Sequence, residues 1–301
     1  MTTLESIDGV RRDVALAPMT TYKVGGPAAF FLEAESEEQL ATAMVALPEG
    51  LDLFVLGRGS NVVISDRGFS GLVVRLGAPF SSGDLEADGR VVAGGGMALP
   101  KLARYAAKHE RAGLEFFVGI PGSVGGAVRM NAGGHGSDTS ACLASARFVR
   151  RGHDEAVELP TELLDLSYRH SNLGDGDIVV AATFVTHHRP AAEIDAELRV
   201  ITRWRKEHQP GGTLNAGSVF KNPSGDSAGR VIDALGLRGY RLGPVAVSEM
   251  HANFFVADSE ATAQDIRNLV VAVRSEVATR GGIELVPEIR FVGDFDEWSP
   301  T

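Results

Sequence analysis

One serine lies in a turn of small residues beside a lysine and an amide. Ser218 follows Asn215-Ala216-Gly217, and the chain continues with Val219-Phe220-Lys221-Asn222-Pro223. No Gly-x-Ser-x-Gly elbow occurs in the sequence, so Ser218 does not resemble an activated nucleophile. Its hydroxyl could instead donate a proton or bind a ligand. The alternative is an ordinary structural turn, because small residues of this kind are common in turns.

Two charged residues far from that serine could act on an anion. Arg169 lies in the polar cluster Tyr168-Arg169-His170-Ser171, and a guanidinium can hold a carboxylate or phosphate bidentately. Glu288 lies in an apolar stretch, where a partly buried carboxyl would have a raised pKa and could donate a proton. The alternatives are a surface arginine at Arg169 and a strand-edge ion pair between Glu288 and Arg290. Glu284 is a weaker candidate on the same stretch.

Two glycine-rich segments could bring the backbone close to a ligand. Gly57-Arg58-Gly59-Ser60-Asn61 follows an expected strand, and successive N–H groups in such a segment can bind an anion. It lacks the third glycine of a Rossmann fingerprint and the Gly-Lys-Ser/Thr of a P-loop, and a tight hairpin is the alternative. The second segment, Gly119 to Gly134, mixes glycines with Ile, Val and Met. This mixture favours backbone packed against a flat, partly apolar ligand over a glycine-rich buried turn.

The composition limits the class of ligand. The chain has 301 residues and a net charge of -10, without the basic footprint of a protein that binds nucleic acid. Cys142 is the single cysteine, so an intramolecular disulfide is impossible, and we expect a small buried hydrophobe there. The 8 histidines show no metal-binding spacing, and we predict no metal.

No segment has the properties of an export signal or a membrane span. Residues 1–17 lack an apolar core region, and no apolar run approaches the ~20 residues that a span needs. These observations predict a cytoplasmic protein with no membrane contact. Nothing in the chain indicates an obligate protein partner.

The sequence predicts both helices and strands around the candidate residues. Ser36-Glu37-Glu38-Gln39 and Thr262-Ala263-Gln264-Asp265 each predict a capped helix start. Residues 283–292 predict a final strand interrupted by Pro287. We expect three domains, namely residues 1–79, 80–205 and 206–290, with the tail 291–301 returning to the first.

Taken in order along the chain, these motifs resemble the UDP-N-acetylenolpyruvoylglucosamine reductase family, also called UDP-N-acetylmuramate dehydrogenases. The resemblance covers nearly the whole chain, from Thr20 to Val292. One such motif would be weak evidence, but the ordered set is highly specific. The further matching stretches are Thr21-Tyr22-Lys23-Val24-Gly25-Gly26, residues 66–71, Ala228-Gly229-Arg230 and residues 247–253.

The resemblance implies an α+β fold and its cofactors. Two FAD-binding subdomains of the vanillyl-alcohol-oxidase type, residues 1–79 and 80–205, would precede a substrate-binding domain at residues 206–290. NADPH would reduce the FAD, and the substrate would be a UDP-sugar, UDP-N-acetylglucosamine enolpyruvate. The implied FAD contacts are Gly57, Arg58, Gly59, Ser60, Asn61, Pro121, Gly122, Ser123, Gly125, Gly126, Asn131 and Gly133.

The resemblance also implies catalytic roles. Hydride from N5 of the reduced flavin would reach the enolpyruvyl double bond, and Ser218 would protonate the other carbon. Arg169 and Glu288 would stabilise the enolate-like intermediate. Asn222 and Lys221 would lie near the substrate diphosphate.

The chain departs from the family pattern at two points. Gly134-His135 replaces the usual Ala-Tyr, so the contacts of that tyrosine are not expected here. Only 49 positions separate Arg169 from Ser218, too few for the tyrosine-bearing gating loop of one branch, and we expect the form without it. Two alternatives remain: another FAD-dependent oxidase of this fold, acting on a hydroxy acid or sugar, and a non-catalytic flavin or nucleotide-sugar binding protein.

Overall fold

The computed structural model describes residues 4–297, and the chain divides into two compact units. The first unit comprises Met1–Arg12, Phe30–Arg58 and Gly71–Arg205, and the second comprises Asp13–Ala29, Gly59–Ser70 and Lys206–Thr301. The division into three domains stays a prediction. Its outermost residues, 1–3 and 298–301, lie outside the described part of the chain.

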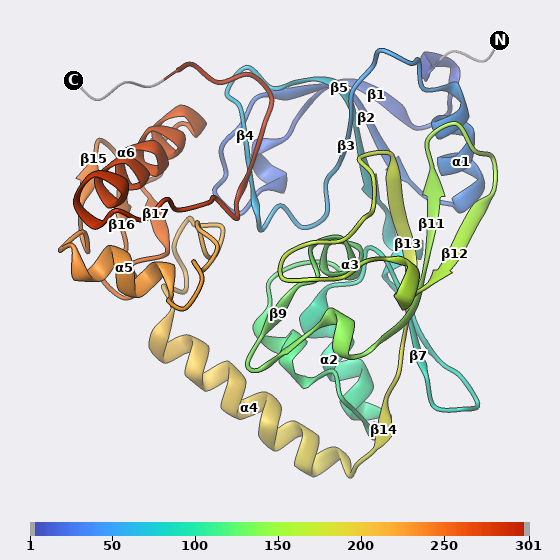
Figure 1. Ribbon diagram of the computed structural model, residues 1–301. Helices are drawn as coiled ribbons and strands as arrows, with labels where there is room; N and C mark the ends of the chain where they lie inside the picture. The colour runs from blue at the N-terminus through green and yellow to red at the C-terminus, as the bar shows by residue number, and fades with distance from the viewer. Residues whose placement is uncertain (1–3, 298–301) are drawn as a thin grey trace. The chain divides into compact units, whose positions relative to one another are not determined.

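The first unit contains an antiparallel five-stranded sheet with the order β12-β11-β13-β7-β6 (Figure 1). Helix α2 (Leu99–Lys108) begins with Pro100 in its first turn, where a missing N–H costs nothing, and buries Leu102 and Ala106 in the core of this unit. The strands are β6 (Gly83–Leu85), β7 (Val91–Gly94), β11 (Leu143–Arg150), β12 (Ala156–Pro160) and β13 (Asp177–Phe184).

A second core cluster of the first unit forms around helix α1 (Glu37–Ala46). The Ser36 hydroxyl oxygen accepts a hydrogen bond from the Gln39 N–H, which confirms the predicted helix start, and Leu40 and Met44 are fully buried. A sheet of order β1-β2-β5-β3 accompanies it. Its strands are β1 (Val10–Ala15), β2 (Pro27–Ala34), β3 (Leu53–Val55) and β5 (Phe69–Leu76).

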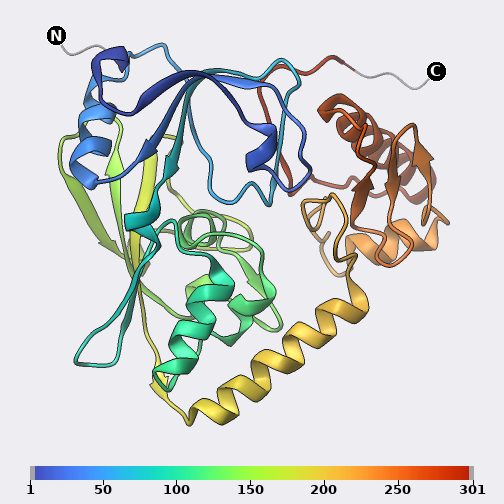
Figure 2. The same cartoon turned by 180° about the vertical axis from the view of Figure 1, so that it is seen from behind.

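The second unit has its own core between two helices and a small antiparallel sheet of order β15-β16-β17. Figure 2 shows both helices, in orange to red, beside these strands. A parallel pair, β4 and β18, completes the unit. The elements are α5 (Ala228–Ala234), α6 (Ala263–Gly281), β15 (Arg241–Leu242), β16 (Val245–Val247), β17 (Phe255–Ala257), β4 (Val62–Ile64) and β18 (Arg290–Val292).

The start of α6 is fixed twice. Thr262 and Asp265 form the predicted capping box. In addition, the Asp66 carboxylate accepts hydrogen bonds from the N–H groups of Ala263 and Gln264 at 2.9 and 3.0 Å. A negative charge is favourable at a helix N-terminus, so Asp66 ties a distant loop of the second unit to α6.

The predicted strand at residues 283–292 is wrong in extent. Only Arg290–Val292 forms a strand, paired in parallel with β4. Pro287 has no N–H to donate to a ladder, and it makes an isolated bridge with Phe220 instead. The preceding residues of this stretch therefore lie beside the Ser218 segment rather than in a sheet.

The remaining α-helices and strands of the described residues lie wholly or mainly in the first unit. The longest is helix α4 (Ala191–His208), which ends just beyond the boundary between the units. In the described part of the chain, no helix combines the length and apolar character needed to span a membrane. The shorter elements are α3 (Val124–Met130), β8 (Arg111–Ala112), β9 (Gly133–Gly134), β10 (Ser137–Asp138) and β14 (His187–His188).

Candidate active site

The Ser218 segment is shaped by an asparagine turn. The Asn215 side-chain oxygen accepts a hydrogen bond from the Gly217 N–H at 3.0 Å. Gly217 has a φ of 74°, which glycine adopts without steric cost. Ser218 follows, partly exposed, and forms an antiparallel backbone bridge with Phe254. The turn therefore delivers the hydroxyl from a defined backbone position.

Glu288 lies beside this segment in the second unit. The Val219 carbonyl accepts hydrogen bonds from the N–H groups of Glu288 and Ile289 at 2.8 and 3.3 Å. Glu288 is partly exposed. The competing Glu284 is exposed and forms an ion pair with Arg274 at 2.5 Å. The structure thus brings Glu288 rather than Glu284 to the Ser218 segment.

Asn61, from the first glycine-rich segment, joins the same group of residues. Its side-chain amide donates to the Glu288 carbonyl at 3.2 Å, and its backbone carbonyl accepts from the Arg290 N–H at 3.1 Å. Gly59 in this segment has a φ of 63°, and a Cβ there would lie 2.3 Å from the Met19 carbonyl oxygen. Position 59 therefore requires glycine for the close contact between its backbone and that of Met19, whether or not the motif binds a ligand.

In the first unit, Gly57 lies against the second glycine-rich segment. A Cβ at Gly57 would lie 2.6 Å from the Ser123 hydroxyl oxygen. Ser123 caps α3, with its hydroxyl oxygen accepting from the Gly126 N–H at 3.4 Å. Gly57, Pro121 and Gly126 are exposed. The result is a backbone cradle that a side chain at Gly57 would fill, which fits a cofactor held by main-chain groups.

Gly125 of the same segment is used for packing inside the first unit. Its N–H donates to the Gly95 carbonyl at 2.8 Å, and a Cβ there would lie 3.1 Å from the Val179 carbonyl oxygen. The Gly122 carbonyl likewise accepts from the Leu99 N–H at 3.0 Å. Part of the glycine content of Gly119 to Gly134 is therefore explained by close backbone packing, as in the buried turn that was the alternative interpretation of this segment.

Arg169 occupies the tip of a tight hairpin in the first unit. Ser167 and His170 exchange backbone hydrogen bonds of 3.2 and 3.1 Å, with Tyr168 and Arg169 between them. Arg169 has a φ of 56°, a left-handed conformation that is strained for a residue other than glycine. Its guanidinium donates to the Gly133 carbonyl at 3.2 Å and lies over the Tyr168 ring. Strain of this kind is tolerated where the side chain has a task.

Asn131 connects the second glycine-rich segment to this hairpin. The residue is 1% exposed and ends α3 with a φ of 39°. Its amide nitrogen donates to the Ser167 carbonyl at 3.0 Å and to the Asp138 carboxylate at 3.3 Å. Its oxygen accepts from the Ser140 N–H at 2.9 Å. The side chain supports the Arg169 hairpin, and a flavin contact by Asn131 stays a prediction.

The residues expected at the substrate diphosphate follow the Ser218 segment directly. The Lys221 N–H donates to the Val286 carbonyl at 2.8 Å. The Asn222 side-chain oxygen accepts from the Ala228 N–H at 3.1 Å, at the start of α5. The Lys221 backbone and the Asn222 side chain are thereby tied into the second unit, while the roles of both residues toward a substrate stay predictions.

His135 packs edge-on against Trp204 with ring centroids 5.1 Å apart. Burial, and then the charge of Arg205, lower the pKa of His135. A Cβ on Gly119 would lie 2.8 Å from the His135 Nε2, so glycine leaves room for the ring. This position therefore presents a neutral imidazole at neutral pH.

Cys142 is buried, as predicted. Burial, followed by the charges of Asp138 and Glu115, raises the pKa of the Cys142 thiol to about 12, so a reactive thiolate does not form at neutral pH. Within residues 4–297, no cluster of His, Cys, Asp and Glu is arranged to hold a metal ion.

Sequence reasoning missed two buried polar side chains in the second unit. Asn253 is 3% exposed and hydrogen-bonds to Phe220, next to the Ser218 segment. Tyr22 is fully buried and its hydroxyl donates to the Phe255 carbonyl at 3.0 Å. Both lie in stretches that match the family pattern. For Asn253, which directly precedes Phe254-Phe255-Val256, a polar residue beside an apolar run was the available signal, because such a group must find a partner when buried. Tyr22 lies between Thr21 and Lys23 and gave no such signal.

Comparisons with known proteins cover both units. A family model described as an FAD binding domain matches residues 28–159, and one described as the C-terminal domain of UDP-N-acetylenolpyruvoylglucosamine reductase matches residues 209–292. The reductase of that name from Nitrobacter hamburgensis is 41% identical over 279 residues, covering 92% of this chain and 91% of the relative. The one from Caulobacter vibrioides is 40% identical over 284 residues, covering 93% and 94%. The crystal structure of the Thermus caldophilus reductase has a TM-score of 0.83 at 36% identity and covers 94% of this chain and 99% of that chain.

The fold and the matches define an FAD-dependent oxidoreductase of α+β class, with an FAD-binding part of the vanillyl-alcohol-oxidase type and a separate C-terminal domain. This confirms the predicted fold class and cofactor. The chain belongs to the UDP-N-acetylenolpyruvoylglucosamine reductase family, which uses FAD and NADPH. The stretch between Arg169 and Ser218 contains no tyrosine and includes β13, β14 and α4, as expected for the form without the gating loop.

Proposed function

We propose that the protein uses NADPH to reduce the enolpyruvyl double bond of UDP-N-acetylglucosamine enolpyruvate, giving UDP-N-acetylmuramate for peptidoglycan precursor synthesis. The observation that carries the proposal is the placement of Ser218 and Glu288 on neighbouring backbone, with the Glu288 N–H 2.8 Å from the Val219 carbonyl oxygen. A hydroxyl and a carboxyl held in this way can act on adjacent parts of one small substrate. The assignment of roles follows the family pattern at matching positions.

FAD bound here and reduced by NADPH would supply the hydride for one carbon of the double bond. Ser218 donates its hydroxyl proton to the other carbon and regains a proton from solvent. One hydride and one proton thus add across the double bond. A positioned general acid of this kind typically contributes ~10²–10⁴ in rate.

Arg169 and Glu288 stabilise the negative charge that develops on the substrate carboxylate. The Arg169 guanidinium can meet a carboxylate bidentately. Glu288 must carry a proton to donate a hydrogen bond to an anion, because an ionised carboxylate would repel it. We therefore assign the protonated form of Glu288 to the enzyme that binds this intermediate.

The two glycine-rich segments would hold the FAD, with main-chain N–H groups directed at its diphosphate and the glycines admitting the flavin. Asn222 and Lys221 would face the substrate diphosphate, and we place the reaction in the cytoplasm. The proposed FAD contacts are Gly57, Arg58, Gly59, Ser60, Asn61, Pro121, Gly122, Ser123, Gly125, Gly126, Asn131 and Gly133.

An anaerobic titration of the purified protein tests this function. NADPH is added while the flavin absorbance is followed, and UDP-N-acetylglucosamine enolpyruvate is added next. Bleaching by NADPH and recovery on the substrate would support the proposed reductase. Bleaching without recovery, or recovery only on a hydroxy acid, a sugar or oxygen, would instead favour another flavin oxidase. A flavin that does not bleach would point to a non-catalytic binding protein.

A further inference from the structure

We propose that Asn253 is a positioning residue that fixes the backbone carrying Ser218 and thereby sets the direction of its hydroxyl. The inference rests on the proposed role of Ser218 as the proton donor. Asn253 itself lies behind the segment, buried to 3% exposure, and has no role in the reaction as assigned above.

Asn253 binds the two residues that follow Ser218 through both its main chain and its side chain. The Val219 N–H donates to the Asn253 carbonyl at 2.9 Å. The Phe220 N–H donates to the Asn253 side-chain oxygen at 2.9 Å, and the Asn253 amide donates to the Phe220 carbonyl at 2.8 Å. The amide side chain therefore takes the place of a neighbouring strand residue for Phe220. Since Phe220 is itself 1% exposed, no water can replace these bonds without opening the core.

The opposite side of the segment is also held. The Val219 carbonyl accepts from the Glu288 N–H, and Ser218 bridges Phe254. Asn253 differs from these partners because its side chain, and not only its main chain, binds the segment through Phe220. Replacing that side chain therefore loosens the Ser218 segment without removing any group proposed to touch the substrate.

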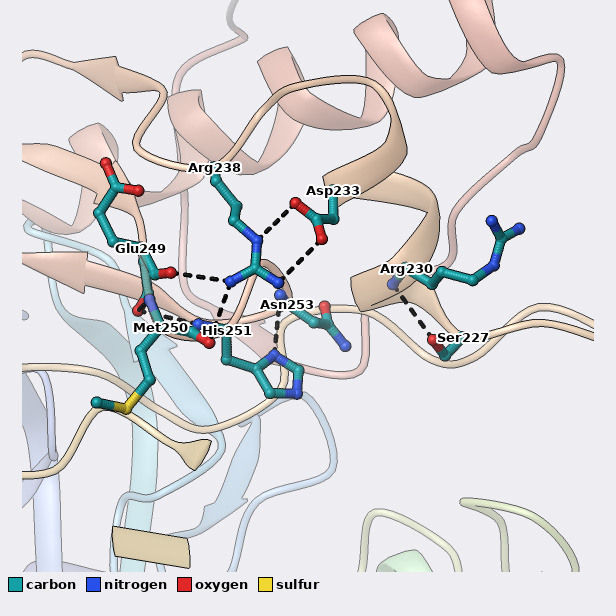
Figure 3. A network of polar contacts seen from close by, with 9 residues as sticks. Ser227, Arg230, Asp233, Arg238, Glu249, Met250, His251 and Asn253 are labelled. Atoms are coloured by element: carbon teal, nitrogen blue, oxygen red, sulfur yellow. Dashed lines mark hydrogen bonds and ion pairs between the residues drawn. The ribbon is translucent and has the colours of Figure 1, made fainter. Parts of the chain in front are cut away.

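A second contact fixes the loop that carries Asn253, and Figure 3 shows it. The Arg238 guanidinium forms a two-pronged ion pair with Asp233 on α5, at 2.5 and 2.9 Å. The same guanidinium donates to the backbone carbonyls of Glu249 and Met250 at 2.9 and 3.3 Å. Arg238 thus holds the loop just before Asn253 against the end of α5.

His251 completes the connection in Figure 3. Its Nδ1 accepts a hydrogen bond from the Asn253 N–H at 3.2 Å. The Ser248 hydroxyl oxygen accepts from the N–H groups of Met250 and His251 at 3.1 and 3.4 Å. The loop therefore has a continuous set of hydrogen bonds from Arg238 to Asn253, and from Asn253 to the Ser218 segment.

Proton transfer is sensitive to this kind of support, because the donor oxygen must lie within hydrogen-bond reach of the accepting carbon. Hydride supply to the cofactor does not depend on the direction of the Ser218 hydroxyl. The proposal therefore predicts that loosening Asn253 affects one half of the catalytic cycle and spares the other.

The test measures the two half-reactions separately by anaerobic stopped flow, on the FAD-loaded protein. Asn253→Ala should slow flavin reoxidation by UDP-N-acetylglucosamine enolpyruvate by about 10–100-fold and leave reduction by NADPH unchanged, since a displacement of about 1 Å can cost about 10²-fold. Arg238→Met should slow the same step by a smaller factor, because it frees the loop and leaves the Asn253 side chain in place. This variant also tests the proposal if Asn253→Ala does not fold.

Amide hydrogen exchange gives a readout that does not depend on turnover. Asn253→Ala should speed exchange at Val219 and Phe220, because their N–H groups lose a fixed partner or its support. Thr262→Ala is the matched control: it destabilises the same unit by removing the cap of α6, and the hydrogen bonds of the Thr262 hydroxyl join it to Asp265 within that cap. It should leave both half-reactions and the exchange of these amides unchanged.

Ser218→Ala, measured alongside, separates the two levels of the argument. If Ser218→Ala slows reoxidation but Asn253→Ala and Arg238→Met do not, the positioning role is overturned and the proposed function stands. Equal slowing of both half-reactions in Asn253→Ala would also overturn the positioning role in favour of a general structural effect. Slowing of reoxidation in Thr262→Ala to the same extent as in Asn253→Ala would do the same. If Ser218→Ala reoxidises normally, the proposed role of Ser218 fails first, and the inference fails with it.

Discussion

The two units present their candidate side chains in opposite ways. In the second unit, Ser218 and Glu288 belong to backbone segments that are hydrogen-bonded to each other and to the segment containing Asn253. In the first unit, Arg169 lies at the tip of a two-residue hairpin with a φ of 56°. The first arrangement fixes a short side chain through its backbone, while the second places a long side chain on a strained turn.

This difference matches the tasks that we propose. A serine hydroxyl reaches only as far as its backbone allows, so a proton donor of this kind needs a fixed main chain. An arginine has a long side chain and a planar fork that orients itself on a carboxylate. Replacing Arg169 should therefore lower turnover with little change in the free energy of unfolding. Replacing residues around Ser218 should change both quantities.

Apart from Ser218→Ala, the largest expected effect is that of Arg169→Gly. Glycine adopts the observed φ without strain, so the free energy of unfolding should change by less than about 1 kcal/mol. Turnover should fall by about 10²–10³-fold, because a charged donor is lost from the developing anion. Steady-state kinetics and denaturant unfolding of the same preparation measure both quantities.

Asp165→Gly is the matched control for that variant. Asp165 is exposed, lies in the same unit and has a φ of 45°, so glycine relieves a similar strain there. Its turnover should equal that of the wild type. A comparable loss of turnover in Asp165→Gly would mean that the backbone of this region, and not the Arg169 guanidinium, carries the effect.

A smaller effect is expected for Tyr22→Phe, which tests how the second unit is held together. Burial raises the pKa of Tyr22, and its hydroxyl donates to the Phe255 carbonyl at 3.0 Å. Losing this bond should lower the free energy of unfolding by about 1 kcal/mol, with turnover unchanged below the unfolding transition. Tyr240→Phe, at an exposed tyrosine of the same unit, should change neither. Equal unfolding curves for the two variants would show that the buried bond adds nothing.

The smallest effect concerns the pH dependence of stability. Burial, and then the charge of Arg238, lower the pKa of His251, and its Nδ1 must be unprotonated to accept from the Asn253 N–H. The unfolded chain binds this proton more readily, at about pH 6.5. The contribution of His251 is therefore complete above that pH and is lost as the pH falls through the lower pKa of the folded state.

His251→Gln should accordingly lose less stability than the wild type on acidification below about pH 6.5. Denaturant unfolding at a series of pH values measures the difference, and the other titrating groups are common to both proteins. His153→Gln, at an exposed histidine of the first unit, should follow the wild-type curve. If His251→Gln also shows the wild-type dependence of unfolding free energy on pH, His251 does not contribute to the acid sensitivity of the second unit.

Local signals in the sequence predicted the helix starts well, because a cap and its partners are neighbours in the chain. Thr262 and Asp265 form their capping box as expected. The second partner of that helix, Asp66, is far away in sequence and could not be predicted from spacing. The strand predicted at residues 283–292 failed for the same reason, since the partner of Pro287 is Phe220 and not an adjacent strand.

The candidate site shows the same limit. The family pattern predicts catalytic roles for Ser218, Arg169 and Glu288. It does not predict the backbone contact between Glu288 and Val219 or the hydrogen bonds of Asn253 to Phe220. The glycine-rich segments were read as ligand contacts, whereas Gly125 is also needed for packing against Val179. Residue types in the sequence predict which side chains could do chemistry. Hydrogen bonds between residues far apart in the sequence determine which of these side chains have a fixed position.

The most direct test of the central claim is a single-turnover experiment with Ser218→Ala under anaerobic conditions. The account predicts that NADPH bleaches the flavin at the wild-type rate and that reoxidation by UDP-N-acetylglucosamine enolpyruvate slows by about 10²–10⁴-fold, since a general acid is lost. Reoxidation at the wild-type rate would contradict the assignment of Ser218 as the proton donor.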